Sequence, residues 1–371
     1  MGKVSDFCKR KNIEISVQRY LIDALGAMAQ GLFASLLMGT ILSTIGEQSG
    51  ISVLVQVGDF AKSASGPAMA VAIGFALKAP SLVLFGAGGP LAVLVVAIVA
   101  AECGKVVANE TKIDILVTPS VTILSGCLLS MACAPAIGAT ATAVGSLIMW
   151  ATELQPFFMG ILVSVLVGLA LTLPISSAAI CAALSLTGLA GGAAVAGCCA
   201  QMVGFAVMSF KENRWGGLVS QGLGTSMLQM GNIVRNPRIW IPPTLASMIT
   251  GPIATCLFQL KMNGPAISSG MGTCGLVGPI GVYTGWVSDV SSGAMVAITA
   301  FDWIGLILIC FILPALLSWV FCQILRKIGW IKEGDLKLES ADDIVKANAA
   351  EIENNKVKAA VTASSSVESK A

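Results

Sequence analysis

Neutral polar side chains are the residues of this sequence that could recognise a ligand. Gln221, Thr225, Gln229 and Asn232 recur three or four residues apart, which predicts one polar stripe along an otherwise apolar helix. Amides and hydroxyls both donate and accept hydrogen bonds, so such a stripe suits an uncharged, polyhydroxylated solute. The alternative is that these groups only join neighbouring helices by hydrogen bonds, with no ligand.

A second polar group lies in residues 263–286, where glycine and proline are frequent and no residue is charged. Glycine and proline oppose a continuous helix, and broken backbone at membrane depth persists only where protein or a wet cavity surrounds it. We therefore expect a re-entrant or broken helix that lines a solute site. The expected site residues are Asn263, Ser268, Ser269, Gly272, Thr273 and Gly275, together with Gln229 and Asn232. The alternative is a flexible loop outside the membrane.

Two ionisable residues stand within or beside apolar runs and are candidates for ion coupling, because charge at membrane depth is costly. Glu102 ends a long uncharged run, and its alternative role is an ion pair with nearby Lys105. Asp302 lies beside Trp303 and could be a proton-coupling acid. It could equally lie at the headgroup level, where Trp is also favoured.

The sequence contains no histidine and eleven cysteines, which lie mainly in apolar runs. Histidine is the commonest general base and zinc ligand, and buried free cysteine behaves as a small hydrophobic residue. We expect no catalytic residue, metal site or cofactor, and so no enzyme acting by itself.

The elements that must position these residues are membrane helices. The chain is 56% hydrophobic and 11% charged, and it contains repeated apolar runs of the length that crosses a bilayer. The fold class expected is an all-α polytopic membrane protein of about ten transmembrane helices with re-entrant or broken segments. The expected spans are residues 20–45, 63–78, 82–101, 117–133, 157–173, 178–189, 191–210, 241–260 and 294–322, with weaker candidates at 51–60, 136–150 and 218–232.

Charge at the two ends suggests the domain organisation. Residues 1–19 form a basic segment, residues 20–330 the transmembrane domain, and residues 331–371 a polar tail that is expected to be largely disordered. Basic residues flank the first and last spans, so both termini should face the cytoplasm. The net charge of +2 gives no indication of nucleic-acid binding.

A faint internal similarity relates residues 20–150 to residues 157–290. Pro135-Ala136-Ile137 recurs as Pro265-Ala266-Ile267, at an offset of 130 residues. Such matches also arise by chance in apolar sequence. Two copies of opposite orientation around a midplane site are a recurring plan of transporters, so an inverted repeat is one interpretation.

The stretches SMLQMGNIVRNPRIWIPP and NGPAISSGMGTCGLVGPIG resemble the EIIC-like membrane family of the sugar phosphotransferase system, in the branch of perfringolysin regulator-type proteins. The resemblance implies a bacterial cytoplasmic-membrane homodimer that moves a small polar solute, such as a sugar, by an elevator-type motion. The segment Gly272-Thr273-Cys274-Gly275 lacks the acid that several sugar EIIC proteins use to hold substrate.

We expect no attached phosphocysteine or phosphohistidine domain, so coupling to phosphoryl transfer would need separate EIIA and EIIB proteins. A carrier that works without phosphoryl transfer is equally open. The rival function is a membrane-embedded solute sensor, or regulator, that uses the same fold and signals through its tail.

Overall fold

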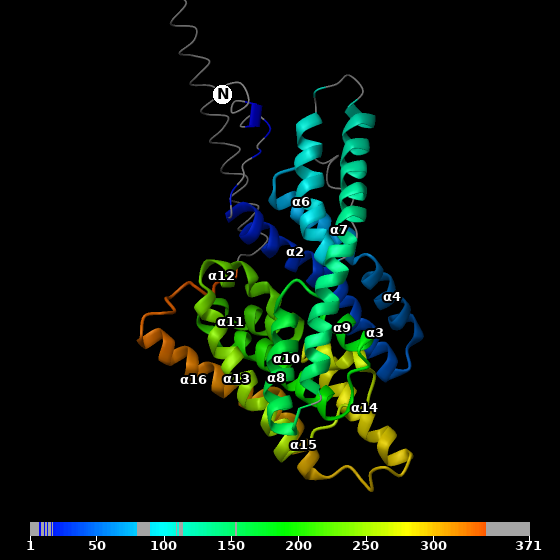
Figure 1. The fold of residues 1–371 in the computed structure, drawn as a ribbon, viewed down its shortest axis with the longest axis vertical. Helices are drawn as coiled ribbons and strands as arrows, with labels where there is room; N and C mark the ends of the chain where they lie inside the picture. The colour runs from blue at the N-terminus through cyan, green and yellow to red at the C-terminus, as the bar shows by residue number, and fades with distance from the viewer. Residues whose placement is uncertain are drawn as a thin grey trace, which may run out of the picture. The chain divides into compact units, whose positions relative to one another are not determined.

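The computed structural model describes residues 7–8, 11, 13, 16, 18–79, 90–108, 110, 114–152 and 154–338 (Figure 1). Most of these residues are helical, and the β-type pairing among them is one isolated antiparallel bridge between Gly188 and Met262. The chain divides into a unit of residues 1–337 and a second unit of residues 338–371. The all-helical fold class is therefore confirmed for the described part of the chain.

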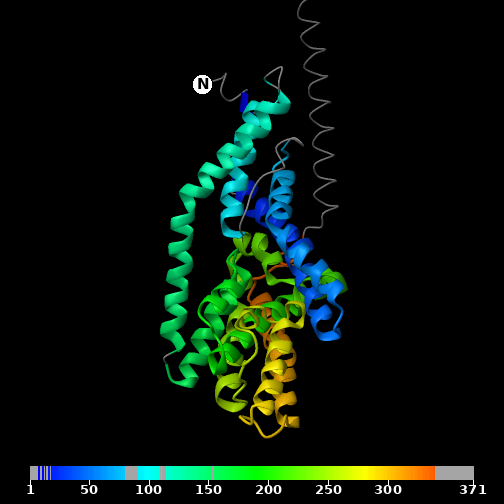
Figure 2. The same cartoon turned by 90° about the vertical axis from the view of Figure 1, so that its right-hand side faces the viewer.

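The first half of the chain contains η1 (Gln18–Asp23), α2 (Ala24–Leu32), η2 (Phe33–Leu37), α3 (Met38–Ser49), α4 (Ser52–Ser63), α5 (Ser65–Ala76), α6 (Pro90–Val107) and α7 (Asp114–Thr152). Helix α7 joins two elements that we expected to be separate, residues 117–133 and 136–150. It packs against α6 and α8 (Figure 1, Figure 2). Its interior Pro135 does not end it, in keeping with the tolerance of membrane helices for proline.

The second half contains α8 (Pro156–Thr172), α9 (Ser177–Ala183), α10 (Gly188–Met208), α11 (Phe210–Val219), η4 (Ser220–Gly224), η5 (Ser226–Gln229), α12 (Met230–Arg235), η6 (Pro237–Trp240), α13 (Ile241–Pro252), η7 (Ile253–Leu257), η8 (Ala266–Gly270), η9 (Cys274–Leu276), α14 (Val277–Ser291), α15 (Ala300–Ile307), η10 (Leu308–Ile312) and α16 (Leu313–Lys327). The short η elements are π-helical or 3-10 turns that interrupt or extend the α-helices.

Three helical stretches among the described residues are long and apolar enough to cross a bilayer: Ala24–Ser49, Gly188–Met208 and Ala300–Lys327. Several other apolar helices are shorter, among them α5 and α8. Proline and glycine divide the apolar runs; α13, for example, ends at Pro252 and continues only as the π-helical turn η7. The count of about ten crossings therefore stays a prediction.

Helices α10 and α13 both pack closely against α8, and each of these contacts is made at a glycine. A Cβ built on Gly197 of α10 would lie 1.8 Å from the backbone oxygen of Ser164 in α8. A Cβ built on Gly251 of α13 would lie 2.0 Å from the oxygen of Gly160 in α8. The helix backbones touch directly at both crossings, as small residues permit in membranes.

The described packing is compatible with an internal repeat. Helix α2 packs against α5, and α8 packs against α10, at about the offset that the sequence similarity suggested. The repeat itself and its inverted orientation both stay predictions.

We predict that Gly197→Ala lowers stability by about 1–3 kcal/mol or more, because its methyl group has no room beside the Ser164 oxygen. Gly26→Ala in α2 is the matched control, since a Cβ there meets nothing within 4 Å. Alanine also favours a helix over glycine, so the control should be neutral or stabilising. Thermal unfolding of purified protein in detergent measures both. Equal midpoints for the two variants would contradict the close packing.

Candidate functional site

The expected polar helix is interrupted in the structure, which corrects the sequence prediction of a continuous stripe. The π-helical turn η4 ends at Gly224, and Thr225 is extended (φ −157°, ψ 142°) before the chain re-enters helix. The amides still form a ladder: Gln229 Nε2 donates to Gln221 Oε1 at 2.9 Å, and Asn232 Nδ2 donates to Gln229 Oε1 at 2.8 Å. Thr225 leaves the ladder and caps η5 instead.

This amide ladder holds the chain's own C-terminal segment, residues 330–337. Four carboxamides, which we call the amide clamp, donate to backbone oxygens of that segment. The bonds are Asn213 to Leu336 (2.7 Å), Gln229 to Leu336 (3.0 Å), Asn232 to Lys337 (2.9 Å) and Asn236 to Trp330 (3.0 Å). In this conformation, the donors of Gln229 and Asn232 are therefore used within the protein, on one neighbouring amide and one backbone oxygen each.

Two aliphatic side chains anchor the same segment. Ile331 is 2% exposed and Leu336 is fully buried, and both belong to the hydrophobic cluster that includes Ile233 and Ile239. We expected the polar tail to begin at residue 331, but the packed unit continues to Lys337. The overall polarity of the segment hid these two anchors, because they are isolated among charged residues.

The glycine-rich segment is broken and buried. It forms the 3-10 turns η8 and η9, and Gly272 and Gly275 adopt positive φ values of 53° and 51°. Ser269 Oγ donates to the Leu186 oxygen at 2.6 Å, and Thr273 Oγ1 donates to the Gly222 oxygen. Ser268, Ser269 and Thr273 are all buried. These hydroxyls fix the shape of the segment, and the positive φ values explain why glycine stands at 272 and 275.

A small cavity of about 70 Å³ lies beside this segment. Met271 and Cys274 form one wall, and the opposite side includes Met28, Leu32 and Leu36 of α2 and η2. Its hydroxyls come from Ser176, Ser177 and Thr225. Small-molecule sites typically measure about 300–1,000 Å³, so the cavity is closed to a sugar in this conformation.

Two of these hydroxyls offer donors to the cavity. Ser176 Oγ accepts from the Ala179 N–H, and Thr225 Oγ1 accepts from the Met227 N–H. In the part of the chain that the structure describes, neither hydroxyl donates a hydrogen bond of its own. The sequence analysis missed Ser176. The signal was the sequence Pro174-Ile175-Ser176, which ends one apolar run and caps the next helix.

The remaining candidates lie apart from this cavity. Asn263 is exposed, and its Nδ2 donates to Asp289 Oδ2 at 2.7 Å. Glu102 Oε1 forms an ion pair with Lys105 Nζ at 2.9 Å, which is the alternative that we gave for it. Asp302 completes a capping box with Thr299 at the start of α15, so its carboxylate is engaged in beginning that helix.

The sequence analysis also missed Gln201, the one amide within the apolar helix α10. Gln201 is fully buried, and its Oε1 accepts from Trp240 Nε1 at 2.9 Å. Its Nε2 reaches Thr244 Oγ1 at 3.4 Å, and Thr172 Oγ1 lies 3.4 Å from its Oε1. This network ties α8, α10 and α13 together beside their glycine contacts. Gln201 could have been recognised from the sequence, because it is a single amide within an apolar run long enough to cross a membrane.

We predict that truncation after Trp330 destabilises the packed unit, whereas truncation after Lys337 does not. The shorter chain loses the buried Leu336 side chain, and a lost leucine costs about 2–5 kcal/mol. The amide clamp would also lose its backbone partners. Thermal unfolding of the two truncated proteins in one detergent measures the difference. Equal stability would show that the docked segment contributes nothing.

The ion pair between Lys211 and Glu333 should make docking of the segment pH-dependent. The hydrogen bond and charge of Lys211 hold the pKa of Glu333 below its ordinary value of 4.5. A lowered folded-state pKa stabilises the fold above pH 4.5, and this contribution is lost as the pH falls through the lowered value.

Glu333→Gln should therefore lower the unfolding midpoint at neutral pH, and the difference from the unaltered protein should vanish as the pH falls through the lowered pKa of Glu333. The matched control is Glu47→Gln, an exposed carboxylate with no ion pair among the described residues. A difference between the Glu333 variant and the unaltered protein that stays constant with pH would contradict this assignment.

Comparisons with known proteins identify the family. The sequence model of the family described as "Phosphotransferase system, EIIC" matches residues 22–338, which covers most of the chain and ends where the packed unit ends. Neither the curated proteins nor the solved structures contain a match. EIIC proteins are bacterial membrane permease components for sugar-type solutes and are generally not catalytic alone. The chain belongs to the EIIC family of the phosphotransferase system.

Proposed function

We propose that this chain carries a small uncharged polar solute, a sugar or a related compound, through the cavity beside the glycine-rich segment. The observation that carries the proposal is the pair of unspent hydroxyl donors, Ser176 and Thr225, at a cavity bounded by Met271 and Cys274. A sugar presents hydroxyl groups that accept such donors. Gly272 and Gly275 shape the wall, and the Ser269 and Thr273 hydroxyls fix it to the Leu186 and Gly222 oxygens, with Ser268 buried beside them.

The opening motion that we propose is of the elevator type. One side of the cavity comes from α2 and η2, and the other comes from residues 171–178, 224–227 and 271–274. Movement of one side relative to the other would widen the cavity without breaking the glycine contacts among α8, α10 and α13. We further propose a homodimer with both termini in the cytoplasm, where separate EIIA and EIIB proteins could supply phosphoryl groups.

A second candidate function is a solute sensor, and the amide clamp favours it. Gln229 and Asn232 are the residues that we expected to bind solute, yet they hold the C-terminal segment. A direct contact between these amides and a solute stays a prediction, and it requires the segment to leave the clamp. Solute binding there would release the tail and pass a signal to the cytoplasm.

Uptake separates the two functions. Purified protein reconstituted in liposomes should accumulate a labelled hexose or disaccharide that also raises its thermal stability, because a ligand of the folded state stabilises it. Binding without net flux would support the sensor and overturn the transporter. No stabilisation by any of a panel of hexoses, disaccharides and their phosphates would overturn the assignment of a sugar-type solute.

We predict that Thr225→Val weakens binding of the sugar found in that screen by about 1–3 kcal/mol, because it removes a buried hydroxyl donor. Thr225→Ser keeps both the donor and the helix cap, and it should restore most of the affinity. Thr284→Val is the control, since the Thr284 hydroxyl donates to the Gly281 oxygen away from the cavity. Equal affinity in the valine and serine variants would place the solute elsewhere.

A further inference from the structure

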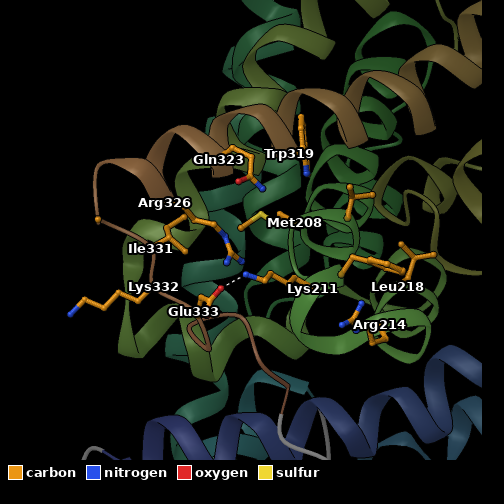
Figure 3. Close-up of a pocket in the computed structure, with 13 residues that line it drawn as sticks. Met208, Lys211, Arg214, Leu218, Trp319, Gln323, Arg326, Ile331, Lys332 and Glu333 are labelled. Atoms are coloured by element: carbon orange, nitrogen blue, oxygen red, sulfur yellow. Dashed lines mark hydrogen bonds and ion pairs between the residues drawn. The ribbon is translucent and has the colours of Figure 1, made fainter.

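A second, larger pocket of about 760 Å³ lies where α10, α11, α16 and the C-terminal segment meet (Figure 3). Its volume is within the range of small-molecule sites, unlike that of the closed cavity. Figure 3 shows the ends of Lys211 and Arg326 turned towards the carboxylate of Glu333, below Trp319 and Gln323 on α16. The proposed transport function does not use this pocket.

The carboxylate of Glu333 occupies a position in the pocket that suits an anion. It forms an ion pair with Lys211 of α11. The hydrogen bond and charge of Lys211 lower the pKa of Glu333, and the charge of Arg326 in α16 adds to this effect. Two cations from different helices thus act on one carboxylate of the C-terminal segment. The chain itself shows which charge this part of the pocket attracts.

Glu333 can leave this position at little cost. Its side chain is 75% exposed and that of Lys211 is 67% exposed, and an exposed ion pair contributes little to stability. Arg326 is held independently, because its Nη2 donates to Glu212 Oε1 at 2.6 Å and both of these side chains are largely buried. If Glu333 turns towards solvent, Arg326 therefore stays at the pocket and Lys211 loses its acidic partner.

Several donors at the pocket are not used within the protein. Arg326 donates from Nε to Cys322 and from Nη2 to Glu212, and its Nη1 donates to none of the described residues. The side chains of Gln323 and Trp319 likewise donate no hydrogen bond in the part of the chain that the structure describes. Gln323 precedes Arg326 by three residues, which is about 4.5 Å along a helix axis. A ligand whose charged end is bound at Arg326 could therefore reach the Gln323 amide with its neutral part.

We propose that this pocket binds a phosphate monoester of a small polar compound, with the phosphate on Lys211 and Arg326 in place of the Glu333 carboxylate. Arginine matches phosphate with paired N–H donors, and lysine adds a point charge. The Gln323 amide and the Trp319 indole N–H would bond to hydroxyl groups of the neutral part. Glu333 is then an internal stand-in for the ligand.

The competition with Glu333 favours a phosphate over a carboxylate. A phosphate monoester carries about −1.5 to −2 charge at neutral pH and has three acceptor oxygens, so it can bond to both cations at once. A free carboxylate carries one charge, as Glu333 does, and it competes poorly because Glu333 is tethered to the chain beside Lys211. The amide clamp does not use Glu333, so the exchange does not require the C-terminal segment to leave.

The test titrates the full chain, purified in a neutral detergent, by isothermal titration calorimetry. The probes are glucose 6-phosphate, inorganic phosphate and short-chain phosphatidylglycerol. We expect glucose 6-phosphate to bind, and Lys211→Gln to weaken its binding about tenfold or more, as loss of a charge-assisted hydrogen bond does. The matched control is Lys327→Gln, an exposed cation of α16 outside the pocket, which should change affinity little.

Glu333→Gln should have the opposite effect, because it removes the internal competitor. Binding of glucose 6-phosphate should tighten about two- to fivefold, which is the range that an exposed ion pair allows. Its matched control is Glu47→Gln, which removes an exposed carboxylate outside the pocket. Gln323→Leu should weaken binding of glucose 6-phosphate but not of inorganic phosphate, since only the ester has a neutral part.

Opposite changes in the Lys211 and Glu333 variants, with little change in the two controls, would support the proposal. Weaker binding in both variants would show that the ion pair only supports the fold, and it would overturn the displacement of Glu333. Tighter binding of phosphatidylglycerol than of glucose 6-phosphate would assign the site to a lipid headgroup and overturn the soluble ester. No binding of any probe would overturn the site itself. All the substituted residues are exposed, so the variants should fold, and circular dichroism would check this.

Discussion

The direct contact of helix backbones at Gly197 and Gly251 is the constraint on which the packed unit depends. Lipid chains are as apolar as leucine, so helices in a bilayer gain little by burying leucine against one another. Close approach at small residues supplies the packing instead, and it brings polar groups within reach: Ser164 Oγ in α8 donates to the Ser247 oxygen of α13 at 2.8 Å. The Gln201 network lies in the same region, so one set of glycines fixes both the helix crossings and the polar interior.

Local features of the sequence predicted local structure well. Glu102 and Lys105 are three residues apart in the sequence, and they form the ion pair that this spacing suggested. Gly264, Pro265 and Gly272 indicated a broken backbone, which the structure also has. Helical spacing failed where a short break intervened, because the π-helical turn η4 ends at Gly224 and Thr225 is extended. The clamp could not be predicted, since Asn232 meets Lys337 across 105 residues and a backbone oxygen leaves no pattern in the sequence.

The closed cavity and the amide clamp differ in how many of their hydrogen-bond donors are already used within the protein. Beside the closed cavity, the hydroxyls of Ser269 and Thr273 donate to backbone oxygens. The capping hydroxyls of Ser176 and Thr225 accept hydrogen bonds and donate none among the described residues. Around the C-terminal segment, every clamp amide donates to the chain itself. Transport would require solute to replace water in the cavity. Sensing would require solute to replace the C-terminal segment as the partner of the clamp amides. The same amide and hydroxyl chemistry would serve both.

The amide clamp holds the segment mainly by its backbone oxygens, and Asn236 also donates to the Asp335 carboxylate at 2.7 Å. Ile331 and Leu336 place side chains in the core, and Glu333 and Asp335 add an ion pair with Lys211 and a hydrogen bond from Asn236. The clamp therefore fixes the place at which the chain leaves the packed unit, next to Lys337. A different tail grafted after Lys337 would leave these hydrogen bonds unchanged.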